Sequence, residues 1–139
     1  MTVETGLPAH PTGELAIRTI AMPADTNANG DIFGGWLMAQ MDLAGGNIAL
    51  RRARGRAATV AVEGMTFVSP VSVGDEVTVY ARILATGRSS MRIAVEAWKR
   101  ARHAEQITKV TAATFVFVAI DDQRRPRPLP DENTELSAA

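Results

Sequence analysis

The spacing of hydrophobic and polar residues changes once along the chain, dividing it into a helical and a strand-rich part. Residues 36–53 (WLMAQMDLAGGNIALRRA) are apolar on most sides at helical spacing, which predicts a long, largely buried helix. A short apolar run over 15–22 (LAIRTIAM) predicts a strand ahead of it. After the helix, apolar and polar residues alternate over 57–69, 75–86, 91–100 and 107–120. Alternation of this length indicates half-buried strands.

The order of these elements predicts an α+β fold. Consecutive strands with short connections, such as a hairpin turn over 87–90, favour an antiparallel sheet. The apolar helix must bury itself against that sheet, so we expect a long central helix wrapped by a curved antiparallel β-sheet. We expect three segments, which are a flexible N-terminal arm (1–14), a single domain (15–120) and a Pro-rich turn with a polar C-terminal tail (121–139).

The amino-acid composition excludes several kinds of chemistry and of binding partner. The 139 residues include no cysteine, which excludes disulfides, thiolate metal sites and a thiol nucleophile. Fifteen basic and fifteen acidic residues balance, so there is no general attraction for nucleic acid or for an anionic membrane. No secretory signal and no membrane-spanning run is evident. We therefore expect a cytoplasmic protein that binds neither nucleic acid nor membrane.

Asp42 is the candidate catalytic residue of the predicted helix. On a helical wheel, one stripe carries the polar residues Gln40, Asn47, Arg51 and Arg54, and Asp42 lies on the opposite side. Its neighbours there are small or apolar, namely Gly35, Met38, Ala39, Gly45, Gly46 and Ala49. An ionised carboxylate in such surroundings is costly unless it is paired. Glycines inside a helix each cost about 1 kcal/mol relative to alanine, which suggests a packing or functional demand. The alternative is that Asp42 caps a loop or forms a structural ion pair with a distant arginine.

The loop before the helix is dense in turn residues and is the second candidate site. It contains Asn27, Asn29, Asp31, Phe33, Gly34 and Gly35. Free backbone N–H groups collect at a helix N-terminus, where the helix dipole is positive. The two glycines leave room for a ligand oxygen, so this end could form an oxyanion hole. The alternative is an ordinary capping loop with Asp31 as the N-cap.

Basic residues gather at two places. Arg51, Arg52, Arg54 and Arg56 lie at the predicted C-terminus of the helix, where the dipole alone favours positive charge. Arg88 stands beside Ser89 and Ser90 in the predicted hairpin turn. Arginine with hydroxyls and free turn amides suits phosphate recognition. A solvated hairpin tip fits this pattern equally well.

Several familiar catalytic motifs are missing. The chain has no G-x-S-x-G, no H-E-x-x-H and no Walker A sequence. Its two histidines, His10 and His103, lie outside the helix and its loop. An enzyme built on this sequence would therefore use a carboxylate together with backbone donors, without a metal.

The run AMPADTNANGDIFGGWLMAQMDLAGG (21–46) strongly resembles the YciA-type acyl-CoA thioesterases and, more distantly, the brain-type acyl-CoA hydrolases. Further similar segments follow over 59–75, 87–90, 95–100, 111–120 and 125–130, so the resemblance covers roughly residues 15–130. The NANGDIFGGW and QMD segments are its most specific parts. The suspected departures lie in the 101–106 connection and the short tail.

The resemblance implies the hotdog fold and hydrolysis of acyl-coenzyme A to a free acid and coenzyme A, as in fatty acid metabolism. Coenzyme A would be part of the substrate, and no separate cofactor is implied. It also implies homodimers joined through their sheets, assembled further into trimers of dimers, with active sites that use parts of both subunits.

The resemblance also suggests roles for particular residues. The family's catalytic aspartate falls on Asp42, and its oxyanion donor on backbone N–H near Gly35. Asn27, Asn29 and Asp31 would lie nearby, with Phe33 and Gly34 beside the substrate. Arg88, Ser89 and Ser90 would meet the phosphates of coenzyme A. Phe33, Trp36 and Met38 are candidates for the acyl channel, with core packing as the alternative.

Two other function classes compete with the hydrolase. A non-catalytic hotdog module that binds acyl-CoA usually carries a DNA-binding segment, and residues 1–14 are too short for a helix-turn-helix. A hotdog dehydratase or isomerase would need a histidine in the helix region, where none is present.

Overall fold

A computed structural model describes residues 10–132. The outer parts of the predicted arm (1–9) and tail (133–139) lie outside the described residues. The elements follow the predicted order: β1 (Glu14–Ile20), a 3₁₀ turn η1 (Pro23–Asp25), α1 (Gly34–Ala53), β2 (Ala57–Phe67), β3 (Glu76–Thr86), β4 (Ser90–Arg100) and β5 (Thr108–Ala119). Within residues 10–132, no helix is both long and apolar enough to cross a membrane.

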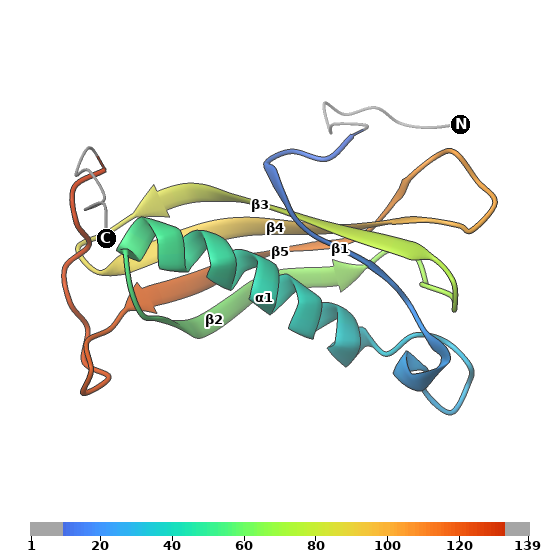
Figure 1. The fold of residues 1–139 in the computed structure, drawn as a ribbon, viewed down its shortest axis with the longest axis horizontal. Helices are drawn as coiled ribbons and strands as arrows, with labels where there is room; N and C mark the ends of the chain where they lie inside the picture. Colours follow the sequence, from blue (N-terminus) through green and yellow to red (C-terminus); the bar gives the residue numbers. More distant parts are fainter. Residues whose placement is uncertain (1–9, 133–139) are drawn as a thin grey trace, which may run out of the picture.

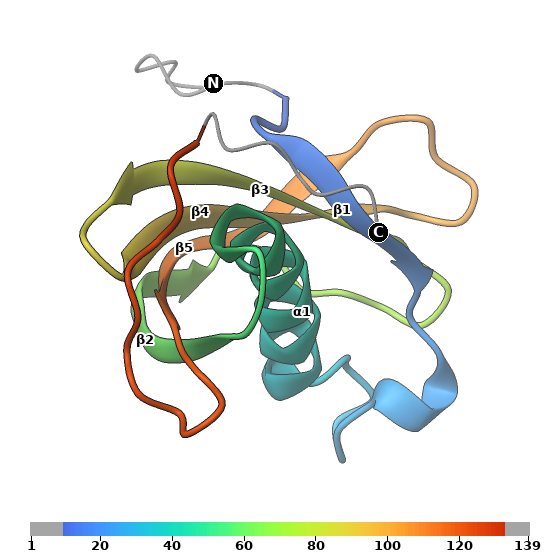
Figure 2. The same ribbon diagram turned by 60° about the vertical axis from the view of Figure 1, so that its left-hand side comes forward.

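The strands form one antiparallel sheet in the order β1-β3-β4-β5-β2, so β1 and β2 are its two edges. The sheet curves over α1, which runs along its concave face (Figures 1 and 2). The inward residues of the central strands, among them Val95 and Phe115, pack with Met41 of the helix in a fully buried core. This is the predicted architecture of a long helix wrapped by an antiparallel sheet, and the prediction is confirmed.

The C-terminal end of α1 is closed by the segment that follows β5. Arg54 adopts the left-handed conformation (φ 52°) that ends many helices. The Arg127 guanidinium donates hydrogen bonds to the carbonyl oxygens of Ala53 and Ile120, both at 2.9 Å. A Cβ on Gly55 would stand 2.8 Å from this guanidinium, and its backbone conformation (φ +156°) is one that residues with a side chain rarely adopt. The Leu129 N–H donates to the Arg88 carbonyl (2.8 Å), which fastens the same segment to the β3–β4 hairpin.

The burial of α1 differs from the prediction. Leu43 and Leu50 are 63% and 48% exposed, whereas Gln40 and Arg54 of the expected polar stripe are half-buried. The helix therefore presents an apolar face to solvent in the single chain. The edge strand β2 adjoins it with further exposed apolar side chains. We call this surface the α1–β2 flank, and it consists of Met38, Leu43, Leu50, Val60, Val62 and Phe67.

Candidate active site

Asp42 lies half-buried on α1, facing the edge strand β2. Its Oδ1 atom accepts a hydrogen bond of 2.5 Å from the hydroxyl of Thr59. Thr59 pairs with Phe117 on the neighbouring strand and so faces inward, toward the helix. Asp42 forms no salt bridge among the described residues, so the alternative of a structural ion pair finds no support. A short bond to one oxygen fixes the carboxylate and leaves its second oxygen available.

Sequence reasoning missed Thr59. The contact joins positions 17 residues apart, on two different elements, and no local pattern links them. The sequence did contain one signal. Thr59 carries a hydroxyl group at a position of β2 that faces the helix, whereas the next paired inward-facing residue, Val62, is apolar. A polar side chain at an inward position requires a polar partner.

The N-terminus of α1 offers free backbone donors. The N-cap residue is Phe33, whose side chain makes no cap, so the interpretation with Asp31 as N-cap is wrong. Trp36 and Leu37 donate their N–H groups back to the Phe33 carbonyl at 3.1 and 3.3 Å. In residues 10–132, the N–H groups of Gly34 and Gly35 have no acceptor. Nothing lies within 4 Å of a Cβ placed on Gly35, so the space on its side-chain side is open.

Asn27 organises the loop that leads into the helix. Its side-chain oxygen accepts hydrogen bonds from the backbone N–H groups of Asn29 (2.9 Å) and Asp31 (3.1 Å), and its own N–H donates to the Asp31 carbonyl (2.7 Å). The Phe33 N–H donates to the Asp25 carbonyl. Such self-contained bonding is typical of an Asx-type turn. The loop thus holds the helix N-terminus in a defined position, while Asn29 and Asp31 themselves are exposed.

Apolar side chains surround the helix N-terminus. Phe33 and Met38 are 52% and 39% exposed, so neither packs in the core of the chain. Trp36 is half-buried against it. A groove of about 350 Å³ opens beside Gly34 and is lined by Ile32, Leu37, Phe67, Val68 and Val71, among others. This groove could accommodate an apolar group bound next to the free N–H donors.

The hairpin residues lie elsewhere in the chain. Arg88 is exposed in the β3–β4 turn, and the backbone oxygens of Arg88 and Ser89 accept bonds from Leu129 and Ala119. This turn is at the end of the molecule where α1 finishes, whereas the Asn27 loop is at the opposite end (Figure 1). A helix of 20 residues is about 30 Å long. One chain therefore does not bring Arg88, Ser89 and Ser90 together with Gly35.

Asp42 and Gly35 are also separated along the helix. Seven residues correspond to about 10 Å of helix rise. A general base and an oxyanion donor must each approach the same reacting group to about 3 Å. The described residues contain no group of three or more histidine and acidic side chains that could hold a metal ion. The chemistry available is a positioned carboxylate and free backbone donors, on separate parts of α1.

The fold, the positioned carboxylate and the free amides at the helix N-terminus can be compared with those of known proteins. Residues 29–105 match the family model of the Thioesterase superfamily. The chain belongs to the thioesterase superfamily. In Salmonella typhimurium, the acyl-CoA thioester hydrolase YciA is 55% identical to this thioesterase over 123 residues, which span 86% of this chain and 92% of the relative. The resemblance to the YciA type is thereby confirmed.

Solved structures agree with this assignment. A hexameric thioesterase from Yersinia pestis superposes with a TM-score of 0.85 at 55% identity, covering 88% of this thioesterase and 99% of that chain. A hexameric broad-specificity acyl-coenzyme A thioesterase, crystallised as a variant with aspartate replaced by alanine, gives a TM-score of 0.84 at 51% identity. That match covers 88% of this chain and 90% of the other. The hotdog fold of the family is therefore the fold of this chain.

Proposed function

We propose that this thioesterase hydrolyses acyl-coenzyme A to a free carboxylic acid and coenzyme A. The observation that carries the proposal is the geometry of α1, where Thr59 holds the Asp42 carboxylate and the Gly34 and Gly35 N–H groups are free. Relatives above 50% identity carry this activity in their names, which supports the choice of substrate. No cofactor is needed beyond the coenzyme A moiety of the substrate.

The separation of Asp42 and Gly35 supports an active site shared between two subunits. A thioester carbonyl cannot reach both residues of one helix, because they stand about 10 Å apart along its axis. We infer that Asp42 of one subunit acts together with the partner subunit's Gly35. A helix that pairs antiparallel with its copy would bring these two positions together.

The exposed α1–β2 flank supports dimerisation on this side. Unpaired edge strands with apolar side chains are rare on monomers, because they invite association. Val60 and Val62 lie on this edge, and Leu43 and Leu50 lie on the adjoining helix face. Covering the flank would also shield the Asp42–Thr59 pair from water. The hexameric state named for two similar structures supports assembly of three such dimers.

The proposed reaction begins with the thioester carbonyl oxygen accepting a hydrogen bond from the partner's Gly35 N–H. Asp42 takes a proton from a water molecule, whose oxygen attacks the carbonyl carbon. The helix N-terminus stabilises the oxyanion of the tetrahedral intermediate. The intermediate then expels the coenzyme A thiolate, which takes up the proton held by Asp42. Direct attack by Asp42, giving a mixed anhydride that water then cleaves, uses the same groups.

The remaining candidate residues receive supporting roles. Asn27 shapes the loop that positions the helix N-terminus, and Asn29, Asp31, Phe33 and Gly34 lie around the reacting group. Arg88, Ser89 and Ser90 would bind coenzyme A phosphates at the outer end of the molecule. The exposed position of Arg88 in the turn suits a ligand that extends from the dimer interface to solvent.

The proposal is tested by measuring coenzyme A release from acyl-CoAs of increasing chain length, alongside the matching acyl-pantetheine thioesters, which lack the nucleotide. We expect turnover of the acyl-CoAs, and a higher KM for the acyl-pantetheines because they forgo the phosphate contacts. Tight binding of acyl-CoA without turnover would instead identify a non-catalytic acyl-CoA-binding module.

A further inference from the structure

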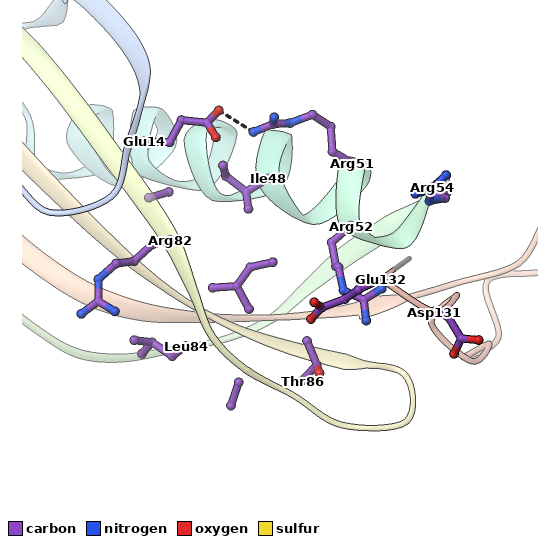
Figure 3. A pocket seen from close by; sticks show the side chains of 13 residues that line it. Glu14, Ile48, Arg51, Arg52, Arg54, Arg82, Leu84, Thr86, Asp131 and Glu132 are labelled. Carbon is purple, nitrogen blue, oxygen red and sulfur yellow. Dashed lines mark hydrogen bonds and ion pairs between the residues drawn. The ribbon is translucent and has the colours of Figure 1, made fainter. Parts of the chain in front are cut away.

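A second cavity lies on the other side of α1 from Asp42. It has a volume of about 690 Å³ and opens between the C-terminal half of α1 and strand β3 (Figure 3). Arg51 on this side bonds to Glu14 of β1, whereas Asp42 bonds to Thr59 of β2, and β1 and β2 are opposite edges of the sheet. The cavity is therefore separate from the Asp42–Thr59 pair of the proposed active site. Its size is typical of small-molecule sites, which span roughly 300–1,000 Å³.

The cavity exists because β1 covers only part of β3. The pairing of β1 with β3 ends at Glu14 and Ala81. Gly13 (φ +99°) turns the preceding chain away, and a Cβ there would stand 2.7 Å from the Ala81 carbonyl oxygen. Beyond this point the edge of β3 has no neighbouring strand among the described residues. The apolar side chains of Ile48 and Ile83 are left as a wall facing the gap.

Two of the arginines that line the same cavity each have a guanidinium nitrogen without an acceptor. Arg51 is bonded to Glu14 at 2.5 Å, and Nη1 of Arg52 donates to the Pro130 carbonyl at 2.7 Å. In contrast, Nε of Arg52 and Nη1 of Arg54 are buried and have no hydrogen-bond partner in the described part of the chain. A buried charged donor without an acceptor costs free energy. The helix dipole favours positive charge here, but it supplies no acceptor for these N–H groups.

We propose that this cavity binds an aliphatic carboxylate. A carboxylate would pair with the guanidinium groups of Arg52 and Arg54, and its hydrocarbon chain would cover Ile48 and Ile83. The rim also carries the side chains of Asp131 and Glu132. These two carboxylates disfavour a dianion such as a phosphate monoester more than a monoanion. The inference rests on the proposed function for the source of this ligand, which is the free acid that acyl-CoA hydrolysis releases.

The inference is tested first on the wild-type assembly. Octanoate is titrated calorimetrically into protein saturated with coenzyme A, which occupies the proposed active site. Octanol and octyl phosphate serve as neutral and dianionic probes with the same chain. Octanoate is expected to bind at least about tenfold more tightly than either, since only it combines a single negative charge with the apolar body. If octanol binds as tightly as octanoate, or if octanoate does not bind, this measurement on the wild-type protein alone overturns the proposal.

Variants then locate the bound carboxylate. Arg52→Met removes the guanidinium and keeps the length of the side chain, so octanoate affinity should fall roughly 10- to 100-fold. Arg54→Met should lower the octanoate affinity as well, and this variant replaces Arg52→Met in the test if Arg52→Met does not fold. Arg92→Met is the matched control, because Arg92 pairs with Glu63 outside the cavity. Unchanged affinity in both cavity variants contradicts the assignment.

Acyl-CoA turnover is measured on the same samples. Normal turnover without octanoate binding overturns the carboxylate site alone. Absence of turnover overturns the proposed function, whatever the carboxylate titration gives.

Discussion

At the residue scale, the hydrogen bond between Thr59 and Asp42 connects the helix to the edge strand. The position of Asp42 among small neighbours could be predicted from the helical wheel. Its actual partner could not, because the pairing depends on how β2 is placed against α1 in three dimensions. The role of Asp31 as a cap was also wrong, since Asn27 rather than Asp31 organises the loop.

Thr59 is expected to position Asp42 without touching the thioester. Thr59→Val keeps the shape of the side chain and removes the hydroxyl donor. We expect kcat for acyl-CoA hydrolysis to fall roughly 10- to 100-fold, the effect of losing a hydrogen bond to a charged group.

The matched control is Thr59→Ser, which retains the hydroxyl and should recover most of the rate. Equal loss in the valine and serine variants would show that packing of the threonine methyl group, not the hydrogen bond, is what matters.

Gly45 and Gly46 form a natural pair for testing why glycines occur inside α1. A Cβ on Gly45 would stand 3.0 Å from the ring of Phe117 and 3.3 Å from Val95, both buried. Gly45→Ala should therefore destabilise the protein by roughly 1–2 kcal/mol, because overpacking exceeds the gain in helix propensity. A Cβ on Gly46 would meet Phe117 at 3.7 Å, an ordinary contact. Gly46→Ala should stabilise by up to about 1 kcal/mol.

Urea denaturation at a fixed protein concentration measures both free energies of unfolding. Equal effects of the two substitutions would contradict a packing requirement specific to Gly45.

At the element scale, the strands were predicted to within about two residues, because alternation is a local signal. The helix begins at Gly34, two residues before the predicted start, and its N-cap is Phe33. Its burial was misjudged for a different reason. An apolar helix surface indicates that other protein atoms pack against it. The composition does not show whether those atoms belong to the same chain or to another one.

An ion pair on the outer face of the sheet gives a pH-dependent prediction. Hydrogen bonds from Arg92 (2.6 and 3.3 Å) and its charge hold the pKa of Glu63 below its ordinary value. Stabilisation from a lowered pKa is present above the unfolded-state value of about 4.3 and is lost as pH falls through the folded-state pKa. The Tm difference between wild type and Glu63→Gln should therefore be constant near neutral pH and shrink in acid.

The pair is exposed, so this Tm difference should be small and should decrease further at high salt. A difference that grows as the pH falls below 4 would contradict the sign of the effect.

At the scale of the whole molecule, the single chain places its catalytic candidates apart. The Asn27 loop, Asp42 and the Arg88 hairpin are distributed along the length of α1. The fold could be predicted from one sequence, because helix and strand patterns are local. The grouping of the site could not, because in the function that we propose it depends on contacts between copies of the chain. The exposed α1–β2 flank is the surface through which we propose that those contacts form.

Leu43→Lys tests whether the flank assembles the enzyme. Leu43 is 63% exposed in the single chain, so the substitution should leave the fold of the subunit intact. If subunits associate through this flank, the lysine should separate them. The mass measured by light scattering should then fall below six times 14.9 kDa, and turnover should be lost in the same variant. Ile107→Lys, a similar exposed change in the β4–β5 connection, should do neither. A fully assembled Leu43→Lys enzyme with normal activity would exclude this interface.

The central claim is that the Asp42 carboxylate performs acyl-CoA hydrolysis. Its most direct test compares the single-turnover rate of coenzyme A release for wild type, Asp42→Asn and Asp122→Asn. The last is a control with the same chemical change on a side chain that is 94% exposed. We expect normal rates for wild type and Asp122→Asn, and a loss of at least about 100-fold for Asp42→Asn with acyl-CoA still bound. A rate for Asp42→Asn within a few-fold of wild type would contradict it.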